Sequence, residues 1–293
     1  MSLSVARGQT LALVGESGCG KTTPGRAILR LIEPDEGRVE LDGVDVTALD
    51  PEPLRALRRR MQMIFQDPYA SLNPRLSVGA AIRGPMEVHR IPDAKEKVGA
   101  LLERVGLSAR YAERYPHEFS GGQRQRIGTA RAIAVEPDLI VADEPVSALD
   151  VSVQAQILNL LADLRDAMGL TLVFIAHDLS VVRHLADDVA VMYLGRVVER
   201  PPRDAIFSEA RHPYTQSLLS AVPRIGRREK RVILGGEVPS PVNPPAGCAL
   251  HPRCPLAFDR CRSEVPENHQ VSDGHRVACH LYDGSSELVS IRR

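Results

Sequence analysis

The stretch GESGCGKTT, from Gly15 to Thr23, decides the fold of this chain. Its members are Gly15, Glu16, Ser17, Gly18, Cys19, Gly20, Lys21, Thr22 and Thr23. They fit the pattern G-x-x-x-x-G-K-[ST], which follows a strand and opens a helix, and the apolar run Thr10 to Val14 predicts that strand. The glycines let backbone N–H groups surround phosphates, Lys21 reaches the β- and γ-phosphates, and Thr22 offers a hydroxyl to Mg²⁺. A glycine-rich turn that only caps a helix is the alternative reading, and the strand–loop–helix context disfavours it.

Two further apolar runs end in polar side chains. Leu139 to Ala142 stops at Asp143 and Glu144, and Leu172 to Ala176 stops at His177. The carboxyl ends of parallel strands form the ligand-binding edge of α/β sheets. Asp143 is therefore expected to hold the Mg²⁺ shell and Glu144 to polarise an attacking water, although a lone Asp-Glu pair would usually be a solvated turn.

The remaining patterns predict an α/β fold with a helical insertion. Apolar residues at helical spacing from Val153 to Met168, followed by Gly169, predict a crossover helix with a glycine C-cap. Residues 67–134 combine prolines with helical patterns. After Arg196 the chain reads as loops, and a proline-rich linker precedes four cysteines.

Composition excludes several classes of protein. Lys plus Arg equals Asp plus Glu at 37 each in 293 residues, which is not the charge of a dedicated nucleic-acid binder. The length predicts one large domain with a smaller appendage. No apolar run approaches a membrane span and no secretory signal follows Met1, so we expect the chain in the cytosol.

The segment Ser120-Gly121-Gly122-Gln123 has two readings. It is a capping box, with Ser120 as N-cap and Gln123 at the third helical position. Its adjacent glycines could also expose N–H groups to an anion at a helix N-terminus. The residues alone leave both readings open.

Six motifs in order make the chain resemble the ATPases of ABC transporters. They are Gly15–Thr23, Gln66, Ser120–Arg124, Leu139–Glu144, Ser147–Asp150 and His177, and the match spans residues 8 to about 200. The resemblance implies a P-loop NTPase fold: a RecA-like core, an ABC helical subdomain at about 67–134 and an antiparallel β subdomain. It assigns 1–225 to the nucleotide-binding domain and 226–293 to a small cysteine-containing C-terminal extension.

The same resemblance implies the roles of the site residues. Two such domains sandwich two ATP molecules, so Ser120 and Gly122 act on the nucleotide of the other subunit. Gln66 joins the Mg²⁺ shell and senses the membrane partner, and His177 holds the γ-phosphate and the lytic water. Nucleotide contacts are also implied for Gly121, Gln123 and Asp150. The other eight histidines are read as structural.

Segments outside these motifs narrow the family. Gln66–Pro74, Tyr115–Arg126, Arg211–Thr215 and Gly236–Ser240 resemble the ATP-binding subunits of oligopeptide, dipeptide, nickel and glutathione importers, most of all the second ATPase of dipeptide systems. This implies an ATPase that energises import of peptides or a related solute. The implied partners are a second ATPase subunit, in a heterodimer or a homodimer, two permease subunits and, indirectly, a solute-binding protein. The chain would lie peripherally at the cytoplasmic face of the membrane, without nucleic acid.

Two other functions remain as alternatives. Soluble ABC proteins of translation or DNA repair usually hold two ATPase units or long coiled coils, and neither is visible in this sequence. A nucleotide-binding interaction subunit with poor turnover is the other. Family members also usually carry a segment before the phosphate loop with an aromatic that stacks on adenine, whereas only fourteen residues precede Gly15 here. We therefore expect a missing adenine platform and weaker ATP affinity.

Four of the five cysteines, Cys248, Cys254, Cys261 and Cys279, fall in the last fifth of the chain. Disulfides are disfavoured in the cytosol, and four thiolates suit either zinc or an iron–sulfur cluster. The spacing lacks paired Cys-x2-Cys knuckles, and similar tails in peptide-importer ATPases carry cysteines suited to a four-iron four-sulfur cluster. We rank such a cluster ahead of zinc and of reduced thiols.

Overall fold

The computed structural model describes residues 1–221 and 234–283. The chain folds into two compact units. We call Met1–Leu3, Leu11–Lys21 and His177–Arg293 the loop unit, and Ser4–Thr10 with Thr22–Ala176 the helical unit. The predicted boundary between residues 225 and 226 lies outside the described residues. In the part of the chain that is described, no helix is long and apolar enough to cross a membrane.

Three parallel strands form the centre of the helical unit. They are β4 (Met61–Ile64), β5 (Leu139–Asp143) and β6 (Thr171–Ala176), with β5 between the other two. Met61 pairs with Leu139, and Leu139 pairs with Thr171. Every residue of β5 and β6 is buried, as continuous apolar runs predict for a parallel sheet covered on both faces. The predicted strands before Asp143 and before His177 are confirmed.

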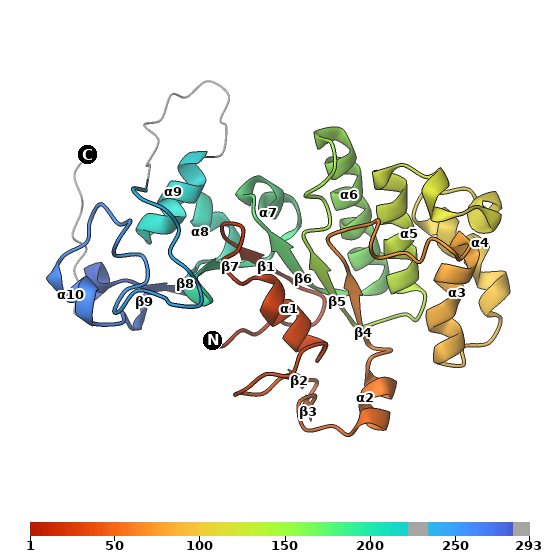
Figure 1. Ribbon diagram of the computed structural model, residues 1–293, viewed down its shortest axis with the longest axis horizontal. Helices are drawn as coiled ribbons and strands as arrows, with labels where there is room; N and C mark the ends of the chain where they lie inside the picture. Colours follow the sequence, from red (N-terminus) through yellow and green to blue (C-terminus); the bar gives the residue numbers. More distant parts are fainter. Residues whose placement is uncertain (222–233, 284–293) are drawn as a thin grey trace. The chain divides into compact units, whose positions relative to one another are not determined.

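Helices surround these strands, and of them α1 packs on β5 and β6, and α5 packs on β4. The helices of this unit are α1 (Thr22–Ile28), α2 (Pro51–Leu57), α3 (Val78–Val88), α4 (Ala94–Arg104), α5 (Gly121–Ile133) and α6 (Val151–Met168), with 3-10 turns η1 (Ala109–Glu113) and η2 (Pro116–Glu118). The predicted crossover helix is α6, and its C-cap Gly169 has a left-handed φ of 64°. Helices α3 to α5 gather together in Figure 1, which confirms the predicted helical insertion.

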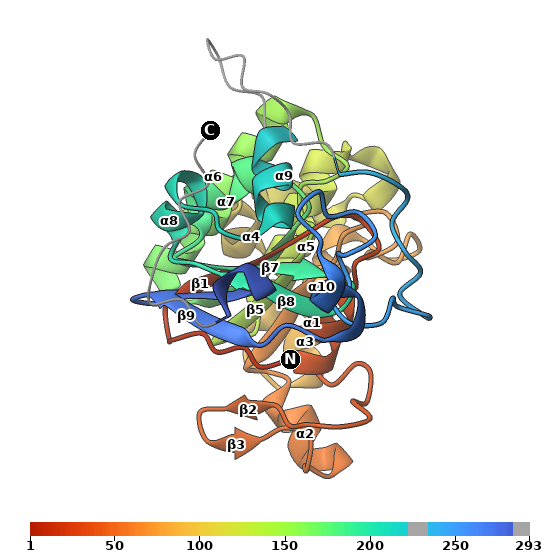
Figure 2. The ribbon, with the colours of Figure 1, turned by 90° about the vertical axis from the view of Figure 1, so that its left-hand side faces the viewer.

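A small hairpin completes the helical unit. Strands β2 (Glu40–Leu41) and β3 (Val44–Asp45) pair with each other, and α2 lies beside them in both Figure 1 and Figure 2. Each strand is only two residues long, too short for sequence alternation to reveal.

The loop unit contains a mixed sheet. Its strands are β1 (Thr10–Val14), β7 (Asp188–Tyr193), β8 (Arg196–Arg200), β10 (His275–Ala278) and β9 (Asn268–Ser272), hydrogen-bonded in that order. Strands β1 and β7 are parallel, and the other pairs are antiparallel. Its helices are α7 (Leu179–Leu185), α8 (Arg203–Ser208), α9 (Pro213–Ala221), α10 (Asp259–Ser263) and the 3-10 turn η3 (His280–Tyr282).

The expectation of loops after Arg196 is wrong. Strand β8 begins at that residue, and two helices follow it. Strands β9 and β10 of the cysteine-containing region pair with β8 and so continue the sheet of the loop unit. Short polar strands at a sheet edge, such as the sequence NHQVS of β9, carry little apolar signal.

Candidate functional site

The phosphate loop has a conformation that only glycine supports at several positions. Gly18 and Gly20 have φ values of 79° and 95°, in the left-handed region. A Cβ on Gly15 would lie 2.3 Å from the carbonyl oxygen of Met192, a backbone atom of the neighbouring strand. The N–H of Cys19 donates to the carbonyl of Glu16 at 3.3 Å and closes the turn. The three glycines are therefore required by the shape of the loop.

The loop is folded around the ammonium group of Lys21. Lys21 is 4% exposed, and its Nζ donates to the carbonyl oxygens of Gly15 at 2.8 Å and Glu16 at 2.9 Å. Lys21 thus places a compact positive charge at the loop backbone, which is the role of the P-loop lysine toward phosphates. Cys19 is also buried in the loop, and burial raises the pKa of its thiol, so it stays a thiol near neutral pH.

Thr22 and Asp143 meet within the helical unit. The Thr22 hydroxyl donates to Asp143 Oδ1 at 3.0 Å, and Asp143 is 2% exposed at the end of β5. Helix α1 reaches this position because Gly25 allows close packing: a Cβ there would lie 2.8 Å from Ile175 Cδ1. A hydroxyl and a carboxylate side by side are hard oxygen ligands of the kind that Mg²⁺ prefers, so these two residues fit a magnesium site.

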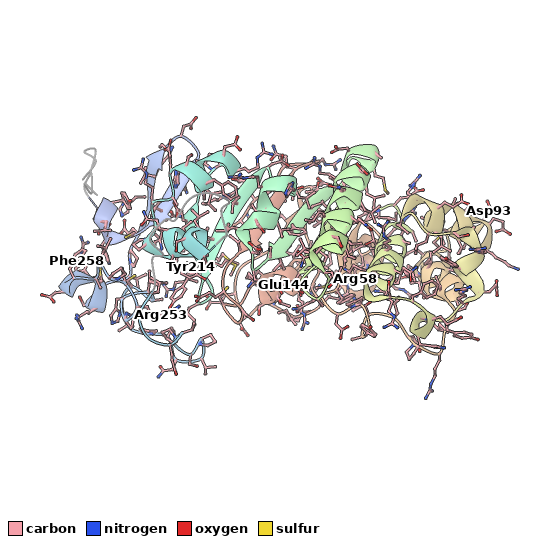
Figure 3. The ribbon with its side chains drawn as sticks, turned by 90° about the horizontal axis from the view of Figure 1, so that it is seen from above. Arg58, Asp93, Glu144, Tyr214, Arg253 and Phe258 are labelled. Atoms are coloured by element: carbon pink, nitrogen blue, oxygen red, sulfur yellow. The ribbon has the colours of Figure 1, made fainter. Side chains whose placement is uncertain are left out.

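Glu144 follows Asp143 in a strained backbone conformation. Its φ is 42°, and its N–H donates to the carbonyl of Ile175 at 3.1 Å. A left-handed non-glycine residue costs energy and is concentrated at functional sites. Gln66 donates from Nε2 to Glu144 Oε2 at 3.1 Å. The structure thus brings two predicted site residues together at the end of the strands, where Figure 3 labels Glu144.

The Ser120–Gln123 segment forms the predicted capping box. The N–H of Gln123 donates to Ser120 Oγ at 3.4 Å, and the N–H of Ser120 donates to Gln123 Oε1 at 3.1 Å. The glycines also have a packing role, because a Cβ on Gly122 would lie 2.4 Å from Val153 Cγ1 of α6. A Cβ on Gly121 would lie 3.3 Å from Leu149 Cδ2. This turn therefore lies against the start of α6.

Asp150 and His177 occupy exposed positions. Asp150 is the N-cap residue of α6, and its side chain makes no capping hydrogen bond. His177 directly follows β6 and belongs to the loop unit. The next residue, Asp178, caps α7 by accepting a hydrogen bond from the N–H of Ser180 at 2.7 Å. Both predicted residues thus stand at loop positions directly before helices.

The predicted metal-binding cysteines are free and close to one another. Burial, aided by the neighbouring Cys248, Cys254 and Cys261 thiols, raises the pKa of Cys279 to about 12. Burial is also the first cause of the raised pKa of Cys248 and of Cys254. Within residues 1–221 and 234–283, however, no group of three or more His, Cys, Asp or Glu side chains could hold a metal ion. The sulfur atoms are neighbours without forming a ligand set.

Three residues near the phosphate loop were missed from the sequence. The Tyr214 hydroxyl accepts a hydrogen bond from the N–H of Glu16 at 2.7 Å, and Arg253 Nη1 donates to Glu16 Oε2 at 2.8 Å. Glu199, which is 1% exposed, binds the segment that carries Tyr214. No pattern in one sequence pairs residues separated by 198 and 237 positions.

Two family models match the chain. Residues 1–147 match a model described as ABC transporter, and residues 198–261 match one described as oligopeptide/dipeptide transporter, C-terminal region. The first match includes the phosphate loop, Asp143 and Glu144, and the second includes Tyr214, Arg253 and three of the C-terminal cysteines.

Curated relatives are similar over nearly the whole chain. The probable peptide ABC transporter ATP-binding protein y4tS of Sinorhizobium fredii is 57% identical over 96% of this chain and 81% of its own length. The oligopeptide transport ATP-binding protein AppF of Bacillus subtilis is 51% identical over 96% of this chain and 88% of its own length. The dipeptide transport ATP-binding protein DppF of Haemophilus influenzae is 51% identical over 97% of this chain and 88% of its own length.

Solved structures agree with the fold. A dimeric, post-hydrolysis form of the ATP-binding cassette MJ0796 bound to ADP and Pi has a TM-score of 0.63 and 30% identity, covering 69% of this chain and 88% of the cassette. CbiO1 of Clostridium perfringens, part of the ABC transporter complex CbiONQ, has a TM-score of 0.65 at 26% identity, covering 71% and 83%. The predicted P-loop NTPase fold is confirmed.

Proposed function

Because this chain belongs to the family of ABC transporter ATP-binding proteins, we propose that it is the ATP-hydrolysing subunit of an importer for dipeptides or oligopeptides. The observation that carries the proposal is the combination of a complete phosphate loop and the strand-end pair Asp143–Glu144 with a peptide-transporter C-terminal region in one chain. Relatives similar over nearly the whole chain are named as peptide, oligopeptide or dipeptide transport proteins, so we set the translation and DNA-repair alternative aside.

In this proposal each site residue has one role in ATP hydrolysis, which follows from the chemistry of its side chain. Lys21 would bind the β- and γ-phosphates, and Thr22 and Asp143, which lie within hydrogen-bond distance of each other, would hold Mg²⁺. Bound Mg²⁺ neutralises negative charge on the phosphate oxygens. The Glu144 carboxylate accepts a proton from the attacking water, and Gln66 fixes the orientation of that carboxylate. His177 holds the γ-phosphate, and Ser120 and Gly122 contact the nucleotide of a second subunit, either identical or paralogous.

A groove in the helical unit supports docking on a membrane partner. A cavity of about 340 Å³ is lined by Leu29, Leu31, Arg58, Met61, Gln62, Met63, Phe65, Pro85 and Arg131. Leu31 is 46% exposed and Phe65 is 37% exposed, so apolar surface is available to a partner. Arg58 Nε is buried without a hydrogen-bond partner, and Figure 3 labels this side chain.

We propose that a short cytoplasmic segment of a permease subunit occupies this groove, with apolar side chains against Leu31 and Phe65. Phe65 lines the groove and precedes Gln66, whose amide binds Glu144. One residue therefore separates the docking surface from the hydrolytic base. Leu31→Asp should abolish co-purification with the permeases and leave ATP hydrolysis by the isolated chain unchanged. Val44→Asp, at another exposed apolar residue, is the matched control and should retain the permeases.

The four C-terminal cysteines support a further proposal, that they bind a metal cofactor, an iron–sulfur cluster in preference to zinc. Their support is that the cysteines lie close to one another; burial raises the pKa of Cys248, Cys254 and Cys279, which opposes formation of the thiolates that bind metals. Metal ligation requires thiolates, so binding would release protons and would strengthen as pH rises. As they stand in this structure, the cysteines do not fit a ligand set, and no step of hydrolysis depends on them.

Reconstitution tests the proposed function. The chain would be co-expressed with a candidate second ATPase, permeases and solute-binding protein, and the purified complex would be placed in lipid vesicles. We expect ATP-dependent uptake of peptides of two to five residues, and loss of uptake with the Glu144→Gln chain. A complex that hydrolyses ATP but takes up nickel or glutathione, and not peptides, would contradict the substrate class.

A further inference from the structure

Two segments from the C-terminal half of the loop unit converge on Glu16, the second residue of the phosphate loop. One carries the sequence Arg211-His-Pro-Tyr, and the other carries Arg253 between Cys248 and Cys254. Both lie within the region that matches the peptide-transporter model. Figure 3 labels Tyr214 and Arg253 in the same part of the picture. Neither residue has a part in the hydrolysis chemistry described above.

Tyr214 is held rigidly before it reaches the loop. The Glu199 carboxylate accepts the N–H groups of Arg211 at 2.7 Å and His212 at 3.1 Å, which fixes the turn at the start of α9. The Tyr214 ring is fully buried and meets the Tyr193 ring edge to face, with 4.7 Å between ring centroids. Its hydroxyl then accepts the N–H of Glu16 at 2.7 Å. The amide of Glu16 is thus bound to a fully buried side chain.

Arg253 binds the carboxylate of the same residue through two hydrogen bonds. Its Nη1 lies 2.8 Å from Glu16 Oε2, and its Nη2 lies 3.3 Å from Oε1. The Arg253 side chain is 9% exposed and that of Glu16 is 30% exposed, so the pair is shielded from solvent more than a surface ion pair. Two consecutive turns hold Arg253 in place. The backbone N–H of Arg253 donates to the carbonyl of Leu250 at 2.9 Å, and the backbone N–H of His251 donates to the carbonyl of Cys248 at 2.9 Å.

Glu16 is also one of the two residues whose carbonyls hold Lys21. Fixing the amide and the carboxylate of Glu16 therefore fixes the backbone that places the Lys21 ammonium. We propose that Tyr214 and Arg253 are positioning residues that clamp Glu16 and hold the phosphate loop in its ATP-binding shape. A loop that is ordered before ATP arrives loses less conformational entropy on binding. The C-terminal region thereby becomes part of the nucleotide site of its own subunit.

The clamp is tested with four single variants of the full chain: Tyr214→Phe, Arg253→Gln, Arg253→Lys and Glu16→Gln. We would measure the KM for ATP and kcat, and the Kd of a fluorescent ATP analogue. Arg253→Gln and Glu16→Gln should raise KM and Kd about tenfold, and Tyr214→Phe about threefold, as expected for losing charged and neutral hydrogen bonds respectively. Because the clamp does not touch the reacting atoms, kcat should stay within about twofold. Arg253→Lys, which keeps one charged contact, should lie between wild type and Arg253→Gln.

Two comparisons separate a clamp from a merely structural role. Both substitutions remove the same Glu16–Arg253 ion pair. The double variant Glu16→Gln with Arg253→Gln should therefore bind ATP no more weakly than whichever single variant binds it less tightly. Arg260→Gln, which removes the ion pairs of Arg260 with Glu264 and Asp283 in the same region, should leave KM unchanged. Unchanged KM in Tyr214→Phe and Arg253→Lys, or additive losses in the double variant, would overturn the proposal. If Arg253→Gln does not fold, Tyr214→Phe and Arg253→Lys decide the question.

Discussion

Gly122 packs against α6 within its own subunit, and the proposed function also has it contact the nucleotide of a second subunit; a pair of substitutions separates these two roles. In Gly122→Ala the new Cβ would lie 2.4 Å from Val153 Cγ1, far inside van der Waals contact. Overpacking of this kind costs about 1 to 3 kcal/mol of folding free energy. The next nearest atom is Val153 Cβ at 3.8 Å, an ordinary contact. Trimming Val153 to alanine therefore removes the clash and leaves a well-packed interface.

We expect Gly122→Ala to lower the free energy of unfolding in urea by about 1 to 3 kcal/mol. Addition of Val153→Ala should recover most of that loss. ATPase activity should remain low in the double variant, because a Cβ wedged between this turn and α6 keeps the backbone of residue 122 from approaching the second subunit's phosphate as closely as glycine does. Val153→Ala alone is the control and should hydrolyse ATP at nearly the normal rate. A stable double variant with wild-type ATPase activity would refute the contact with the second nucleotide and leave Gly122 a packing role only.

Three further predictions concern the loop unit. Gly15→Ala should weaken ATP binding by about tenfold or more in a fluorescence titration, because its Cβ would meet the Met192 carbonyl at 2.3 Å; unaltered affinity would contradict the fixed loop. Burial lowers the pKa of His212 from 6.5 to about 4, so only the unfolded chain gains a proton as pH falls below 6.5. Unfolding free energy should then drop by about 2 kcal/mol between pH 7 and pH 5, and a His212→Gln chain should lose that part of the pH dependence. Anaerobically purified protein should be brown and contain iron and sulfide, and both should be absent from the Cys261→Ser protein. A colourless protein with one zinc would rule out the cluster. A metal-free protein with normal activity would rule out any metal.

Local patterns allowed the strands that precede the candidate site residues to be predicted from the sequence. The buried strands before Gly15, Asp143 and His177 are continuous apolar runs, and short runs of this kind usually form buried strands in a globular protein. The capping box at Ser120 and the C-cap at Gly169 depend on the chemistry of a few neighbouring residues. These features are encoded within short windows, so a single sequence reveals them.

Features that depend on distant packing could not be predicted. Gly122 looked like an exposed anion-binding glycine, and its close approach to Val153 appears only once α5 and α6 are packed. Glu16 looked like a variable position of the phosphate loop, yet its partners lie 198 and 237 residues away. The antiparallel strands β8 to β10 are polar and short, and they form because β8 offers an edge to which β10 can pair.

The central claim is that this chain hydrolyses ATP with Glu144 as the base, and one substitution tests it most directly. Glu144→Gln keeps the size and most contacts of the side chain, including a group that can still bind Gln66, and removes only its capacity to take a proton. The measurement is phosphate release per mole of protein at saturating Mg²⁺-ATP, with the Kd for ATP determined on the same preparation. We predict an unchanged Kd and turnover reduced by roughly 10² to 10⁴, the usual contribution of a positioned general base. Turnover close to that of the wild-type chain would contradict the assignment.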